Sequence, residues 1–168
     1  MNEMDLTWFH NRRARGLLPL YGPRLTFTLN TPLISILFAQ NLLDCTRPNI
    51  QRFREEGALR MFDISLNPRP GSHPTLRIVT ASILAIKNDD ASLNPDSVEG
   101  ALELILPRSI AYLYCGQVSK LFQTDSHFVY LHVEAKNLQY TEVGPRCGKE
   151  RKISVASLRQ FLLKRVCE

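Results

Sequence analysis

The sequence lacks the short motifs that mark common catalytic and nucleotide-binding sites. It contains no GxGxxG, GxxxxGK[ST], HExxH or GxSxG pattern. Each of these patterns holds phosphate-binding amides, zinc ligands or a nucleophile at a fixed spacing. We also detect no internal repeat and no low-complexity segment. The sequence therefore predicts no cofactor, no metal site and no standard catalytic constellation.

Long hydrophobic runs and clustered cysteines are absent as well. The first residues contain no apolar run of about 7–15 residues, which a signal peptide needs. The longest apolar patch, residues 33–39, is far shorter than a membrane span. The four cysteines are widely spaced, without a CxxC pair, which favours reduced thiols. We predict a soluble cytoplasmic protein, with the nucleus or the inner face of a membrane as alternatives.

Charge is plentiful but unevenly distributed. The 168 residues carry a net charge of +5, and Arg supplies 15 of the 21 basic side chains. Counted by segment, residues 87–143 carry a net charge of −4, whereas residues 144–168 carry +5. Planar guanidinium groups bind two oxygens at once, so an Arg-rich end suits phosphate or carboxylate partners.

The hydrophobic patterns predict an α+β fold. We expect a mainly antiparallel sheet of about five or six strands, packed with two N-terminal helices and one C-terminal helix. Residues 1–23 are predicted to be a flexible basic arm, and residues 24–168 a single domain ending in a basic amphipathic helix. The expected helices cover residues 31–44, 48–57 and 155–166, and the expected strands cover residues 24–30, 60–66, 75–87, 101–106, 110–115, 127–134 and 138–143. The 75–87 strand, apolar on both faces, is expected at the centre of the sheet.

Basic residues near both ends form the candidate surface for an anionic partner, either nucleic acid or a negatively charged membrane. The alternative for the last helix is docking on the sheet through its apolar stripe, with the preceding basic cluster left free. The candidate anion-binding residues are Arg12, Arg13, Arg15, Arg146, Lys149, Arg151, Lys152, Arg159, Lys164 and Arg165.

A second basic group lies in the predicted helix 48–57 and just before it. Arg47, Arg52 and Arg54 are candidates for a basic ridge, but Glu55 and Glu56 beside them favour a solvated surface of mixed charge.

A different partner is suggested by Leu18, Pro19 and Tyr21. With Leu20 they form an LPLY segment, which is similar to the LPxY variant of the proline-tyrosine ligands bound by WW domains. The alternative is a loop whose Leu and Tyr side chains pack against the body of the protein.

Catalysis has only weak candidates. His132 and Glu134 fall on one face of the predicted strand 127–134, and Cys115 or Cys147 is a candidate nucleophile. A half-exposed strand face is the favoured explanation of the first pair, since these two neighbours do not by themselves position a nucleophile.

These observations favour a non-enzymatic structural or binding protein that associates with an anionic partner and with itself. In size, basicity and absence of enzyme motifs the chain is similar to small viral matrix or accessory proteins, a similarity of composition alone. The alternative is an intracellular adaptor that binds protein through a sheet edge or the LPLY segment. A small enzyme is the third hypothesis.

Overall fold

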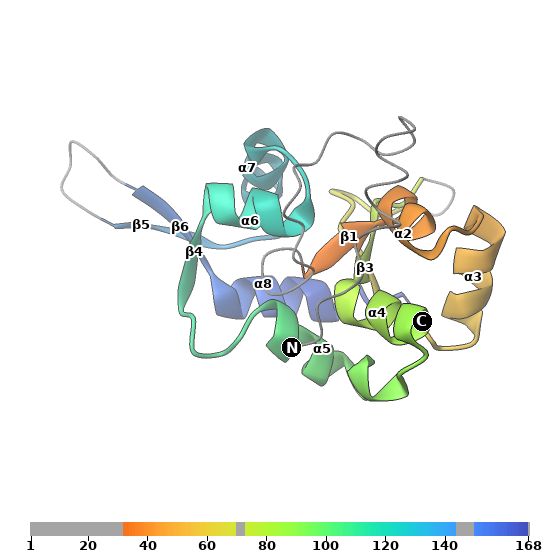
Figure 1. Ribbon diagram of the computed structural model, residues 1–168. Helices are drawn as coiled ribbons and strands as arrows, with labels where there is room; N and C mark the ends of the chain where they lie inside the picture. Colours follow the sequence, from red (N-terminus) through yellow and green to blue (C-terminus); the bar gives the residue numbers. More distant parts are fainter. Residues whose placement is uncertain (1–31, 70–72, 144–149, 168) are drawn as a thin grey trace, which may run out of the picture.

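The structure is a computed structural model, and it describes residues 32–69, 73–143 and 150–167. In this part of the chain, short strands lead directly into helices (Figure 1). Seven α-helices and two three-stranded antiparallel sheets are present in these ranges. The predicted strand 24–30, the arm 1–23 and the boundary between arm and domain fall outside the described residues.

The first half of the described chain forms one βααββα unit, which we call unit 1. Its elements are β1 (Leu33–Ser35), α2 (Ile36–Leu43), α3 (Arg47–Glu55), β2 (Met61–Asp63), β3 (Leu76–Val79) and α4 (Thr80–Asn88). β3 lies between β1 and β2. A 3-10 turn, η1 (Ala91–Leu93), and α5 (Val98–Ile105) then lead to the second half.

The second half, unit 2, repeats the same order of elements. Its elements are β4 (Tyr112–Tyr114), α6 (Cys115–Phe122), α7 (Ser126–Glu134), β5 (Tyr140–Val143), β6 (Glu150–Ser154) and α8 (Val155–Leu163). Its sheet order, β4-β6-β5, matches β1-β3-β2 of unit 1. The structure thus contains a duplication that the sequence analysis failed to detect.

The duplication is visible residue by residue in the backbone. Asp44 and Gln123 both have a positive φ after the first helix of their unit, and they are 79 positions apart. The same spacing relates Gly57 and Lys136, which both have a positive φ after the second helix. Left-handed backbone is unusual for residues other than glycine, so two such matches at one spacing indicate a common local fold.

Hydrogen bonds repeat at equivalent positions too. The amide of Arg60 donates to Ser82 Oγ, and the amide of Gln139 donates to Ser157 Oγ. The central strands also agree, because Ile78 pairs with Ile34 and Met61, as Ile153 pairs with Leu113 and Tyr140. The second hairpin is four residues shorter, so equivalence after it follows a spacing of 75 positions.

The predicted fold class is wrong in its details. Two small sheets and seven helices in the described residues replace one sheet of five or six strands with three helices. The overall α+β character is plausible, and the helix after Ser154 is confirmed, with the Ser154 side chain accepting a hydrogen bond from the Ser157 amide.

The long strand predicted over residues 75–87 is also wrong. Only Leu76–Val79 is extended, and the chain turns into α4 at Thr80. Ala81, Leu84 and Ala85 are compatible with a helix, and a buried helix accounts for apolar side chains on both faces as well as a central strand does. The short strand β3 does occupy the predicted central position, in the sheet of unit 1.

The strands predicted over residues 101–106 and 127–134 are helices as well. They form most of α5 and α7, and the segment between β4 and α7, expected to be a linker, forms α6. In α7 the sequence SHFVYLHVE is rich in residues that favour strands, but Asp125 caps the helix by accepting a hydrogen bond from the Phe128 amide. Packing in the folded chain therefore overrides the local strand preference.

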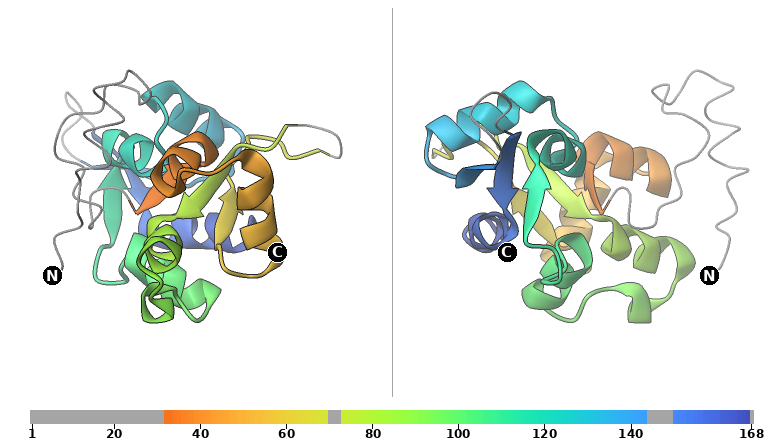
Figure 2. Two further views of the ribbon diagram at one scale, coloured as in Figure 1. Left: turned by 45° about the vertical axis from the view of Figure 1, so that its right-hand side comes forward. Right: turned by 90° about the vertical axis from the view of Figure 1, so that its left-hand side faces the viewer.

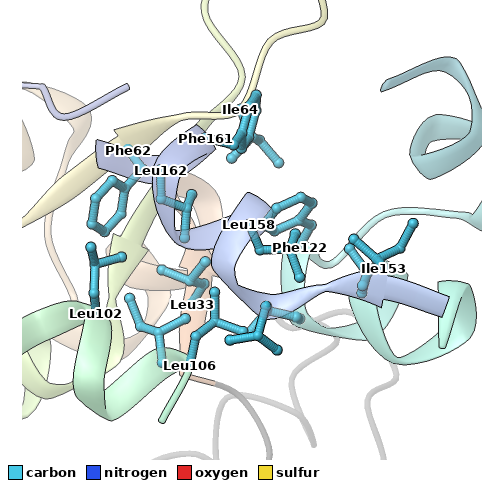
Figure 3. Close-up of a cluster of buried hydrophobic side chains, with 14 of the residues drawn as sticks. Leu33, Phe62, Ile64, Leu102, Leu106, Phe122, Ile153, Leu158, Phe161 and Leu162 are labelled. Atoms are coloured by element: carbon cyan, nitrogen blue, oxygen red, sulfur yellow. The ribbon is translucent and has the colours of Figure 1, made fainter. Parts of the chain in front are cut away.

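The two units pack closely on each other. Unit 1 has its own core around Ile34, Ile50 and Ile78. The other face of its sheet, with Leu33 and Phe62 fully buried, joins the core of unit 2. Figure 3 shows these two side chains beside Leu102 of α5 and Leu162 of α8. One face of the unit 1 sheet is therefore covered by unit 2.

The segment after α8 returns to unit 1. Val166 forms an antiparallel bridge with Phe62, the amide of Asp63 donates to the carbonyl of Arg165, and the amide of Cys167 donates to the carbonyl of Met61. These bonds continue the sheet of unit 1 beyond β2. Both units are thus held together by backbone pairing as well as by apolar packing.

Candidate nucleic-acid interface

Each unit contains a helix-turn-helix. In unit 1 the turn is Asp44, Cys45 and Thr46, between α2 and α3; in unit 2 it is the segment 123–125 between α6 and α7. A turn of three residues whose first residue is left-handed redirects the chain sharply and places the second helix across the first. The second helix of such a pair is the one that enters the major groove in DNA-binding helix-turn-helix proteins.

The second helix of each unit lies on the outside of the molecule (Figure 2). In α3, Ile50 is buried against unit 1, whereas Arg47 and Gln51 are exposed. Pro48 occupies the first turn of α3, where the missing amide costs no helical hydrogen bond. The exposed start of α3 therefore presents one guanidinium and one carboxamide to solvent.

Further along α3 the basic groups are partly neutralised. Arg52 Nε lies 3.6 Å from Glu56 Oε1, in an exposed i,i+4 pair. Gln51 Nε2 donates a 3.0 Å hydrogen bond to Glu55 Oε1. The mixed-charge surface that the sequence favoured is present at the C-terminal end of α3, and the free basic character is concentrated at Arg47.

The second helix of unit 2 has a different exposed face. Val129 and His132 are buried, whereas Ser126, His127 and Tyr130 are exposed. These side chains are polar or aromatic, and none of them is an arginine or a lysine. The two helices are therefore equivalent in position but present different chemistry.

Each helix-turn-helix is followed by a β-hairpin. Strands β2 and β3 form the first hairpin, whose loop carries the exposed Arg69. Strands β5 and β6 form the second, which projects from the body in Figure 1. The predicted anion-binding residues Arg146 and Lys149 lie between β5 and β6, outside the described residues, as do Arg12, Arg13, Arg15, the LPLY residues Leu18, Pro19 and Tyr21, and Cys147. For Arg151 the described structure gives the strand but not the side chain.

The predicted basic residues that can be placed do not form one surface. Lys152 on β6 is half-buried, with its ammonium 5.0 Å from the ring centre of Tyr114. Lys164 is exposed just after α8. Arg165 donates from Nη1 to the carbonyl of Ser65 and lies over the ring of Phe161, so its charge is used within the fold.

The prediction that Arg159 belongs to a free basic surface is wrong. Arg159 is buried and its guanidinium binds two carboxylates, with Nη1 3.0 Å from Glu103 Oε2 and Nη2 2.5 Å from Glu99 Oε1. Nη1 also donates to the carbonyl of Leu106. Hydrogen bonds from Arg108 and Arg159 lower the pKa of the Glu99 carboxyl. Arg159 therefore connects α8 to α5.

The proposed pair of His132 and Glu134 is not formed. Residues two apart on a helix point in different directions, and His132 is fully buried while Glu134 is exposed. Burial is the main cause that lowers the pKa of His132 to about 4. Its ring contacts those of Phe128, which is tilted, and Phe161, which is edge-on, at centroid distances of 4.6 and 5.1 Å. It occupies the position of Phe53 in unit 1, so it is a core residue of unit 2.

Cys115 is buried at the start of α6. Within the described ranges, no group of three or more His, Cys, Asp and Glu side chains is arranged to hold a metal ion.

Two exposed residues of α3 were not among the predicted site residues. Arg47 was set aside because of nearby acidic residues, and Gln51 was not considered. The signal that identifies them is the turn between two helices, which is hidden because Asp44 and Gln123 stand where glycine is the usual residue.

None of the helices in the described part of the chain has the length and apolar character that a membrane crossing needs. No family model, curated protein or solved structure matches this chain.

Proposed function

We propose that this protein binds double-stranded DNA through its two helix-turn-helix units. The observation that carries the proposal is the repeated arrangement of two helices, a three-residue turn and a following hairpin in one chain. A major groove is wide enough for one α-helix, and a helix held at the surface by a helix-turn-helix is suited to enter it.

The chemistry at the start of α3 supports this function. Arg47 and Gln51, four positions apart on α3, are both exposed, whereas Ile50 is buried. Arg pairs with the acceptor edge of guanine and Gln with adenine, and both side chains also bind phosphate. In α7 the residues equivalent to Arg47 and Gln51 are Ser126 and Tyr130, so the two units are expected to prefer different base pairs.

The anionic membrane, the other partner that the sequence suggested, is less well supported. Membrane binding by the last helix requires its apolar stripe to face lipid. In α8 that stripe is buried, since Leu158, Phe161 and Leu162 pack in the core. The docking alternative for this helix is therefore the one observed, and only its polar face remains for a partner.

The first experiment is fluorescence anisotropy of the full chain with a labelled DNA duplex of mixed sequence. Single-stranded RNA and acidic vesicles serve as competitors, and salt concentration is varied. Phosphate contacts give a slope of about −0.9 per contact in a log-log plot of affinity against salt. We expect binding to duplex DNA with a slope of several contacts. Absence of binding at low salt, or equal competition by acidic vesicles, would contradict the proposal.

A matched pair of variants locates the surface. Arg47→Gln and Arg108→Gln each remove one exposed positive charge, but Arg108 lies between α5 and β4 and pairs with Glu99. We expect Arg47→Gln to weaken binding by a factor of about ten, typical of a lost base or phosphate contact, and Arg108→Gln to leave it unchanged. Equal effects of the two variants would show that α3 is not in contact with DNA.

A further inference from the structure

The two sheets have equivalent faces with different surroundings. In unit 1 the face that carries Leu33, Phe62 and Arg77 is covered by unit 2. When the strand registers of the two sheets are aligned, the equivalent face of the second sheet carries Tyr112, Thr141 and Lys152. Leu33 is 0% exposed, whereas Tyr112 is 51% exposed. We call the face formed by Tyr112, Tyr114, Thr141 and Lys152 the outer face of unit 2.

From this equivalence we propose that the outer face of unit 2 binds unit 1 of a second copy of this chain. The contact would repeat the one that already joins unit 1 to unit 2 within the chain. One copy would then follow another in a head-to-tail manner, with two different surfaces in contact.

Within the chain this face is covered by α5, α6 and α8. We base the proposed contact on α6. Its buried face, Cys115, Ser119 and Phe122, contributes to the contact with β1 and the rest of the unit 1 sheet. The end of α6 is held by Arg77, which donates from Nε to the carbonyl of Phe122 and from Nη2 to the carbonyl of Gln123. A basic residue on the sheet thus binds the negative end of the helix dipole.

The corresponding surface of unit 1 remains accessible. The positions equivalent to Cys115, Ser119 and Phe122 are Ile36, Gln40 and Leu43, which are only half-buried. At the end of α2 the residue equivalent to Gln123 is Asp44, which is exposed. In the proposed contact, α2 of the second copy therefore takes the place that α6 takes within one chain.

Charge favours the same pairing. Lys152 occupies the position of Arg77, and in the proposed contact it would meet the last carbonyls of α2 and the carboxylate of Asp44. An ammonium beside a carboxylate at a helix end is stabilising. The exposed rings of Tyr112 and Tyr114 supply the apolar area, and tyrosine is enriched at the centre of protein interfaces.

The proposed contact is heterologous, so it does not close into a dimer by itself. Contacts between two different surfaces give rings or open filaments. The charge distribution suggested self-association between the acidic segment 87–143 of one copy and the basic end of another. The contact inferred from the structure uses two different surfaces and does not depend on DNA binding.

The test uses two variants of the full chain, each blocked on one surface. Tyr112→Glu combined with Tyr114→Glu blocks the outer face of unit 2. Gln40→Arg combined with Asp44→Lys blocks α2, and Lys136 shows that lysine is accommodated in the left-handed conformation of Asp44. Mass is measured by sedimentation or light scattering from micromolar to submillimolar concentration, without DNA. Circular dichroism and thermal unfolding verify that both variants fold, and Lys152→Glu provides a second variant of the outer face.

We expect the mass of the natural chain to rise with concentration and each blocked variant to remain at the mass of one chain. A mixture of the two should form a complex of two chains and nothing larger, because one intact pair of surfaces remains. A natural chain that keeps the mass of one chain throughout would overturn the proposal. Self-association that persists in either variant, or a mixture that forms no complex, would also overturn it.

Discussion

Arg77 on β3 donates a 2.6 Å hydrogen bond from its Nε to the carbonyl oxygen of Phe122, the last residue of α6. The bond joins the sheet of one unit to a helix of the other. Its equivalent in unit 2, Lys152, is half-buried against Tyr114 and has no helix in front of it among the described residues. The same sheet position therefore has a structural role between units in one case and faces outward in the other.

This difference predicts unequal effects of the same substitution. Arg77→Met should lower the free energy of unfolding by about 2–3 kcal/mol, because carbonyls at the end of α6 lose charged donors. Lys152→Met should change it by less than about 0.5 kcal/mol, as is usual for residues without such contacts. Urea unfolding followed by circular dichroism measures both. Equal effects would indicate that Arg77 does not couple the units.

The left-handed positions predict opposite effects in the two units. Gly57→Ala should destabilise the protein by about 1 kcal/mol, because φ at Gly57 is 72°, a backbone conformation that is strained for alanine. The added methyl group would contact no neighbour, so no packing gain offsets this strain. Lys136→Gly, at the equivalent position with φ 59°, should stabilise it by a similar amount. Thermal unfolding of the two variants measures both shifts. A common sign would contradict the equivalence of the two positions.

The buried His132 predicts a pH dependence of stability. Its pKa is lowered to about 4 in the folded protein, mainly by burial, while the unfolded chain has the ordinary value of 6.5. Between these values the unfolded state binds a proton that the folded state does not. Stability is therefore complete above pH 6.5 and decreases as pH falls toward 4, by up to about 3 kcal/mol.

The control for this prediction is present in the chain, since Phe53 occupies the equivalent position in unit 1. His132→Phe retains an aromatic ring between Phe128 and Phe161 and removes the titration. Between pH 6.5 and pH 4, we expect the free energy of unfolding of this variant to change less than that of the natural chain. Parallel profiles for the two proteins would show that His132 is not buried in its neutral form.

Arg159 and Arg108 share a carboxylate and predict different costs. Arg159→Ala should destabilise the protein by about 2–4 kcal/mol, because it removes a buried group that satisfies the Leu106 carbonyl and holds α8 to α5. Arg108→Ala breaks an exposed pair with Glu99 and should have a much smaller effect, because solvent screens such a pair. Chemical unfolding distinguishes them. If Arg159→Ala were as stable as Arg108→Ala, the contacts of Arg159 would not hold α8 to α5.

Local signals in the sequence were sufficient for some elements. Gly57 correctly predicted the end of α3, and Ser154 the start of α8, because the requirements of a helix end are carried by one or two residues. The strands predicted over residues 60–66 and 75–87 do contain β2 and β3, which pair with each other. In α7 the signals conflicted, because its β-branched and aromatic residues favour a strand and only packing decides for a helix.

The duplication was missed for a related reason. Few side chains are shared between the units, Leu42 with Leu121 and Leu59 with Leu138 among them. What the units share is backbone conformation, such as the left-handed turns at Asp44 and Gln123, and that is not visible in residue identity. Because the helix-turn-helix was not recognised, neither was the candidate site at Arg47.

Val166 pairs with Phe62, and Arg165 binds Ser65 across 100 positions of sequence. During synthesis on the ribosome, β2 therefore emerges long before the segment that pairs with it. Until then the edge of the first sheet carries open amides and carbonyls, together with apolar side chains that unit 2 has not yet covered. A nascent chain of unit 1 alone is thus expected to need chaperone protection, and this sheet is completed only after unit 2 has been synthesised.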